Sequence, residues 1–254
     1  MTMYCLLFTL DDTAESMVYT KTFRQCVCVS LCVCVFLSIS VCILIFGSFR
    51  VSHLHRFLLI VAETLLLRNM NMMGTIPPEI FNKVTRLTEL SLSENAFTGQ
   101  IPTTIGRLKD LHAFFLGENK LNGSIPRQIG LMADLTTLEL QGNRIGGSIP
   151  KLIAALNGLE QMNLARNKLT GTIPSDIGNL HRLQTLFVET NKLEGAVPSE
   201  IGNLQTLKQA RLYDNNLEGS IPTEVCDLTT DEDLVYLGAD CNGDFRCECC
   251  TKCF

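Results

Sequence analysis

The sequence predicts an α/β fold: a solenoid that coils in the right-handed sense, with a parallel β-sheet on its concave face and short helical or 3₁₀ turns on its convex face. Three repeated features predict it: a glycine-proline corner at fixed spacing, a short leucine-rich stretch before each corner, and an asparagine between the two. A period in the twenties is typical of proteins that stack one small structural unit many times.

The corner has the form G-x-[IV]-P. Its first spacing is 25 residues and every later spacing is 24. Glycine reaches backbone angles closed to other residues, and the proline that follows fixes an extended turn that lacks an N–H donor. The chain should therefore change direction at each corner glycine, and these are Gly74, Gly99, Gly123, Gly147, Gly171, Gly195 and Gly219.

The leucine-rich stretch before each corner has the period of a strand with one buried face. In residues 87–92, Leu90 and Leu92 alternate with polar neighbours. So short a strand must pair with its copies in neighbouring repeats, which gives a parallel sheet. We expect one shared interior to hold Leu90, Leu116, Leu140, Leu164, Leu186 and Leu212.

An asparagine stands four residues before each corner glycine from the second corner onward. Where the chain turns inward, its buried backbone groups need partners, and a short amide supplies both donors and an acceptor. We therefore expect a structural ladder, formed by Asn95, Asn119, Asn143, Asn167, Asn191 and Asn215.

The full pattern, L-x-x-L-x-L-x-x-N-x-[LF]-x-G-x-I-P-x-x-I-G-x-[LM], resembles the plant-specific class of leucine-rich repeats over about residues 65–228. That class occurs in receptor-like kinase ectodomains, receptor-like proteins and polygalacturonase-inhibiting proteins. The resemblance implies recognition of a partner, although one fold serves many partners.

Charge and motifs argue against other classes of function. The net charge is −5 and the basic residues are scattered, which disfavours nucleic-acid binding. The chain has no kinase glycine loop, no phosphate-loop G-K-[ST] and no G-x-S-x-G elbow, and its four histidines join no catalytic arrangement. We expect neither an enzyme nor a cofactor or metal site.

Residues 1–56 form a hydrophobic amino-terminal segment with three interpretations. Residues 26–46 carry no charge and are long enough to span a bilayer, so the segment is a signal anchor or a cleaved secretory signal. Alternating Cys-Val is also what the repeated codons TGT-GTG encode, so a gene-model artefact is the third interpretation. The first two place the repeats outside the cytoplasm, on a single-pass membrane protein or a secreted one.

The repeats span residues 57–225, and their first coil is degenerate because Met70 replaces the ladder asparagine. We expect residues 57–61 to shield the open end, unless the true cap is missing from this sequence.

Two aromatic residues, Phe115 and Phe187, share one outward-facing column of the predicted sheet, about 14 Å apart. Five glutamates make one side of this concave face acidic: Glu89, Glu94, Glu118, Glu139 and Glu189. The predicted ligand-binding residues, Phe115, Arg166, Phe187, Arg211 and Tyr213, would contact a protein, peptide or glycan. Scattered surface residues of a solenoid are the alternative. Asn122 begins the one N-x-[ST] glycosylation motif.

Residues 226–254 form a cysteine-rich carboxyl-terminal cap that resembles caps of algal leucine-rich repeat proteins. Six cysteines in so short a stretch favour disulfides, with the close thiolate spacing of a zinc site as the alternative. Sequence does not choose among the fifteen pairings. The disulfide candidates are Cys226, Cys241, Cys247, Cys249, Cys250 and Cys253.

These features predict a non-catalytic recognition module, secreted or tethered to a membrane, like a receptor-like protein without a kinase domain. A membrane co-receptor would then be a second partner. The alternatives are an inhibitor of a cell-wall-degrading hydrolase and an intracellular scaffold.

Overall fold

The computed structural model describes residues 63–230, 234–241 and 245–254. The amino-terminal segment, with its proposed anchor or signal, and the shielding residues 57–61 lie outside these ranges. Among the described helices, none is both long and apolar enough to cross a bilayer.

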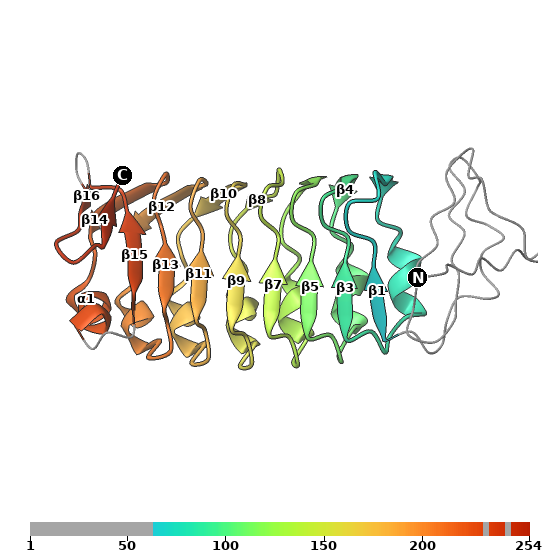
Figure 1. Ribbon diagram of the computed structural model, residues 1–254, viewed down its shortest axis with the longest axis horizontal. Coiled ribbons are helices and arrows are strands. Elements are labelled where there is room, and N and C mark those ends of the chain that lie inside the picture. The colour runs from blue at the N-terminus through green and yellow to red at the C-terminus, as the bar shows by residue number, and fades with distance from the viewer. Residues whose placement is uncertain (1–62, 231–233, 242–244) are drawn as a thin grey trace, which may run out of the picture. The chain divides into compact units, whose positions relative to one another are not determined.

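A parallel sheet of nine strands runs through the repeats, and its strands lie side by side in chain order (Figure 1). Successive coils pair in register, so that Leu90 lies between Leu65 and Phe114. The predicted parallel sheet is therefore present, with one strand per coil. Its strands are β1 (Thr64–Leu66), β3 (Glu89–Ser91), β5 (Ala113–Phe115), β7 (Thr137–Glu139), β9 (Gln161–Asn163), β11 (Thr185–Phe187), β13 (Gln209–Arg211), β15 (Tyr236–Ala239) and β17 (Lys252–Cys253).

The predicted short turns on the opposite side are 3₁₀ helices. Each begins directly after the proline of a corner, or, in the first coil, at the second of two prolines. The proline holds the last residue of the corner in an extended conformation, and the 3₁₀ helix begins after it. The turns are η2 (Pro78–Asn82), η3 (Thr103–Arg107), η4 (Arg127–Leu131), η5 (Lys151–Ala155), η6 (Ser175–Asn179) and η7 (Ser199–Asn203); the α-helix α1 (Thr223–Thr230) takes this place in the last coil.

Two further parallel sheets run along the corners, which the sequence analysis did not predict. One joins β2 (Met73–Thr75), β4 (Ala96–Gln100) and β6 (Lys120–Asn122). The other joins β8 (Gly146–Gly147), β10 (Lys168–Gly171), β12 (Lys192–Ala196), β14 (Asn216–Ser220) and β16 (Phe245–Arg246). Backbone groups that leave the main sheet find partners here in the next coil. An isolated bridge between Ser124 and Gly146 and the hydrogen bond from the Arg144 N–H to the Leu121 carbonyl span the gap between the two sheets.

The coils share one dry interior. All six leucines predicted to meet there are at most 1% exposed. The ladder asparagines close the turn beside it: the Nδ2 of Asn143 donates to the carbonyls of Leu116 and Leu140, 3.0 Å away in each case, and its Oδ1 accepts from the N–H of Leu121. The same contacts recur from Asn95 to Asn215, so each asparagine links two coils.

Every corner glycine has a positive φ, between 71° and 99°. A second row with positive φ was not predicted. It directly precedes the ladder position of each coil, which is Met70 in the first coil and an asparagine in the others: Asn69, Glu94, Glu118, Gly142, Arg166, Thr190 and Asp214. Six of these seven are not glycine, and such backbone costs each about 1–2 kcal/mol. The row recurs in every coil because the strand must turn here to bring the asparagine inward.

The carboxyl-terminal cap continues the sheet and is tied by disulfides. β15 and β17 extend the nine-stranded sheet, and three disulfides pair Cys226 with Cys249, Cys241 with Cys253, and Cys247 with Cys250. The expected disulfides are therefore present in place of a zinc site. The Asp240 carboxylate accepts from the backbone N–H of Asp214 at 2.9 Å, which closes the exposed end of the last coil.

Candidate ligand-binding surface

One face of the nine-stranded sheet covers the interior, and we call the other its open face. In the described part of the chain, four buried side-chain atoms lack a hydrogen-bond partner: Ser93 Oγ, Gln141 Oε1, Glu189 Oε2 and Arg211 Nε. All four belong to outward-facing columns of this sheet. Because buried polar groups are nearly always paired, these four atoms mark the open face as the place where a hydrogen-bonding group from outside the chain would fit.

The carboxyl-terminal end of the open face carries an aromatic cluster, which consists of Phe187, Arg211, Tyr213, Tyr236 and Phe254. The Arg211 guanidinium lies 4.2 Å from the centre of the Phe187 ring and 5.6 Å from that of Tyr236. The Tyr213 and Phe254 rings stack with their centres 3.8 Å apart. These rings present apolar surface around the Arg211 cation, and Lys252 Nζ lies 4.5 Å from the centre of the Phe254 ring. Rings that hold cations in this way are enriched where proteins bind partners.

Glu189 supplies the negative charge beside this cluster. Glu189 is 8% exposed, and its carboxylate oxygen Oε1 lies 3.7 Å from Arg211 Nη1. Burial raises the pKa of Glu189, and the nearby Arg211 only partly opposes that shift. Burial also raises the pKa of Tyr213, with the Glu189 charge acting in the same direction.

The structure brings three of the five predicted ligand-binding residues together: Phe187, Arg211 and Tyr213. The guanidinium of Arg166 instead bonds to Glu118, two coils towards the amino terminus, although its charge still acts to lower the pKa of Glu189. Gly142 lies between these two partners, and a Cβ there would come within 2.6 Å of Glu118 Cδ. Phe115 lies on β5, among the glutamates of the other end.

Sequence reasoning missed Tyr236 and Phe254, which complete the aromatic cluster. Both lie in the cap, where the 24-residue period no longer assigns a column. The pairing of Arg211 with Gly238 and of Gly238 with Lys252 places the cap strands beside β13. The sequence alone does not give the register of these cap strands.

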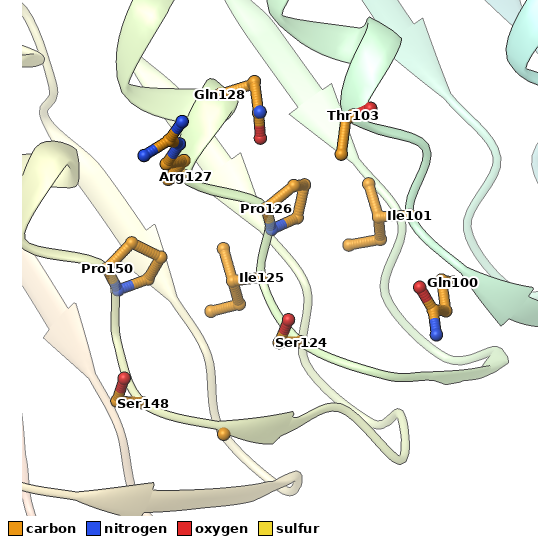
Figure 2. Close-up of a pocket in the computed structure, with 11 residues that line it drawn as sticks. Gln100, Ile101, Thr103, Ser124, Ile125, Pro126, Arg127, Gln128, Ser148 and Pro150 are labelled. Carbon is orange, nitrogen blue, oxygen red and sulfur yellow. The ribbon is translucent and has the colours of Figure 1, made fainter.

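A different hollow, of about 520 Å³, lies on the corner side (Figure 2). Equivalent residues of successive corners line it, such as Ile101 and Ile125, and Ser124 and Ser148. No buried atom without a hydrogen-bond partner lines it in the described structure. It follows from the repeat geometry at the break between the two corner sheets, so we place the candidate site on the open face.

Asn122, the predicted glycosylation residue, ends β6 on the corner side and is exposed. Its glycosylation stays a prediction. Within the described ranges, no three His, Cys, Asp or Glu side chains lie close enough together to hold a metal ion.

The chain matches sequence models of leucine-rich repeats and is similar to solved structures of plant receptors. The sequence model described as "Leucine rich repeat" matches residues 133–193, and a second, "Leucine Rich Repeat", matches residues 86–108. No curated protein sequence matches the chain significantly.

Three similar solved structures are plant receptors. The peptide hormone receptor RGFR1, in complex with RGF2, is 38% identical over 69% of this chain, with a TM-score of 0.63. The GASSHO1/SCHENGEN3 ectodomain from Arabidopsis thaliana, in complex with CASPARIAN STRIP INTEGRITY FACTOR 2, is 34% identical over 72%, with a TM-score of 0.65. The Arabidopsis receptor kinase HAESA, in complex with the peptide hormone IDA and the co-receptor SERK1, is 31% identical over 68%, with a TM-score of 0.62.

The match covers only part of each receptor: 27% of the RGFR1 chain, 24% of the GASSHO1/SCHENGEN3 chain and 31% of the HAESA chain. The chain thus spans about a quarter to a third of the length of these relatives.

Proposed function

Since the chain is a leucine-rich repeat protein whose repeats are of the plant-specific type, we propose that it is a recognition module that binds a peptide on the open face of its nine-stranded sheet. The observation that carries the proposal is the position of the four buried atoms without partners, all on this face. A peptide backbone offers both donors and acceptors at short intervals, which suits such atoms.

The aromatic cluster is the proposed main contact. Rings held by stacking lose little freedom when a ligand binds, and Arg211 is already fixed over Phe187. Its Nε is a donor without a partner, so a carbonyl or carboxylate oxygen of the peptide would satisfy it. Phe187, Arg211 and Tyr213 are the residues we assign to this contact.

The setting we propose is extracellular. The three disulfides of the cap suit an oxidising compartment. A co-receptor, as in the HAESA complex, would be the second partner of the bound state. The proposal covers both a secreted and a membrane-tethered protein.

Selection from a random library of displayed nonapeptides tests this proposal. Peptides enriched on the full chain should lose at least about tenfold in affinity when Arg211→Gln and Tyr213→Ala are combined, because a charged hydrogen bond and a stacking surface both disappear. The control is Arg182→Gln, which removes an exposed arginine from the outer side and should change nothing. The proposal fails if the library enriches no peptide over the Arg211→Gln/Tyr213→Ala variant.

A further inference from the structure

The amino-terminal half of the open face contains an acidic hollow of about 380 Å³. It lies over β1, β3, β5 and β7, several strands away from the aromatic cluster. Its lining residues are Leu66, Arg68, Glu89, Ser91, Ser93, Glu94, Phe115, Gly117, Glu118, Glu139 and Gln141.

One glycine shapes the floor of this hollow. Ser93, Gly117 and Gln141 occupy the same column in three successive coils. A Cβ at Gly117 would lie 2.7 Å from the Nε2 of Gln141 and 2.8 Å from its Cδ. The Gln141 carboxamide therefore lies over Gly117, in the space that a side chain at residue 117 would take.

The charges that line the hollow are unbalanced. Glu94 is paired with Arg68, and Glu118 with Arg166. Glu89 and Glu139 form no ion pair with any lysine or arginine of the described residues. Two carboxylates thus remain available to a cation from outside.

Buried acceptors without partners belong to residues that line the same space. Ser93 lines the hollow, is 8% exposed, and its Oγ has no hydrogen-bond partner. Gln141 donates from Nε2 to a Glu139 carboxylate oxygen at 3.3 Å, which leaves its buried Oε1 unpaired. Such groups carry a desolvation cost that a ligand donor would relieve.

The shape of the lining favours an organic cation over a metal ion. Leu66 is 45% exposed, and Phe115, two strands away with Ser91 between them, is half-buried, so both offer apolar surface to an aliphatic stem. A cation above the Phe115 ring would gain a further attraction. No three carboxylates of the described chain converge closely enough to bind a metal ion.

We propose that the acidic hollow binds the cationic end of an arginine or lysine side chain of a peptide. This inference rests on the proposed function, and it specifies the ligand: a basic residue at one position. Phe115 and Arg211 are four strands apart, about 19 Å at the usual strand spacing. About six residues of extended peptide therefore separate the basic residue from the residue at the aromatic cluster.

The test uses a probe smaller than any peptide, N-acetyl-arginine amide, titrated into the full chain and followed by backbone amide NMR. Saturable shifts are expected at Gly117, Glu139 and Gln141. N-acetyl-citrulline amide, which has the same shape without the charge, should bind at least about tenfold more weakly.

Two variants locate the site and one controls for charge. Gly117→Ala, at a position without positive φ, displaces the Gln141 carboxamide into the hollow, and Glu139→Gln removes a carboxylate that forms no ion pair; each should abolish the saturable shifts. Glu200→Gln removes an exposed carboxylate from the outer turn η7 and should leave them unchanged.

The inference is overturned if citrulline amide binds as well as arginine amide, if binding survives in both hollow variants, or if calcium chloride shifts the same amides at lower concentration. Its failure is separable from that of the proposed function. If the chain binds the arginine probe but enriches no peptide, the cation site in the hollow is supported and the peptide proposal fails. If the chain enriches peptides but does not bind the arginine probe, the peptide proposal is supported and the cation site fails.

Discussion

At the residue scale, the open face contains buried polar atoms that form no hydrogen bond within the described chain. Arg211 and Glu189 are the clearest pair, since they are close in space and each keeps one buried atom without a partner. Burial and charge oppose each other there, and the net effect raises the pKa of Glu189. The ionised carboxylate is therefore less favourable in the folded protein than in the unfolded chain.

This shift predicts a pH dependence of stability. Because the folded-state pKa of Glu189 lies above its unfolded value, its contribution is fully present below the unfolded pKa and is lost as pH rises through the folded pKa. The free energy of unfolding of the wild type, relative to that of Glu189→Gln, should thus rise as pH falls from 7 through the folded pKa. Urea denaturation of both proteins across this range measures it, and a constant difference would contradict the assignment.

At the element scale, the 3₁₀ turns stack closely because four of them contain a glycine after the isoleucine. A Cβ at Gly106 would lie 2.6 Å from the carbonyl oxygen of Gln128 in the next turn. The equivalent residues Gly130, Gly178 and Gly202 meet the next coil in the same way. These glycines are needed for close approach between turns and not for positive φ.

Gly106→Ala should therefore destabilise the protein by about 1–3 kcal/mol, the usual cost of overpacking. The matched control is Gly158→Ala, whose added Cβ would lie 3.7 Å from the Leu135 carbonyl oxygen, an ordinary contact. Thermal unfolding of the two variants gives the comparison. Equal losses of stability in both would show that stacking distance is not the cause.

The repeat elements and the disulfide-tied cap were predictable, but the register of the cap strands was not, for a physical reason. A 24-residue period assigns each residue of the repeats to a column, so the leucines of the interior, the corner glycines and the strands that the repeats contribute to the nine-stranded sheet follow from spacing. The corner sheets and the positive φ before each asparagine depend on backbone pairing between coils, which side-chain pattern does not encode. Tyr236 and Phe254 lie where the period ends, so the aromatic cluster was only partly visible.

At the scale of the whole molecule, the described chain is a stack in which each coil contacts its neighbours. Stability is then local, and a change at one end should spread only through nearby coils. The cap is the place to observe such a local loss of stability. Its disulfide between Cys241 and Cys253 links the residue two positions after β15 to the last residue of β17.

Replacing Cys241 and Cys253 by serine should cost about 2–4 kcal/mol, since the bond closes a loop of moderate length. Hydrogen exchange should accelerate in β13 and β15 and stay unchanged in β5 and β7. Serine at Cys247 and Cys250, which are three residues apart, should have a smaller effect because the closed loop is shorter. Uniform acceleration along all strands would contradict a stack of locally stable coils.

The central claim is that ligand recognition belongs to the open face of the sheet. The most direct measurement compares the affinity of one selected peptide for two five-residue alanine variants, both checked for folding by circular dichroism. The first replaces Phe115, Arg166, Phe187, Arg211 and Tyr213; the second replaces five exposed residues of the outer side, Arg107, Arg127, Leu131, Leu152 and Arg182. We predict that the first loses at least about a hundredfold in affinity and the second keeps it; equal affinities, or a loss confined to the second, would contradict the claim.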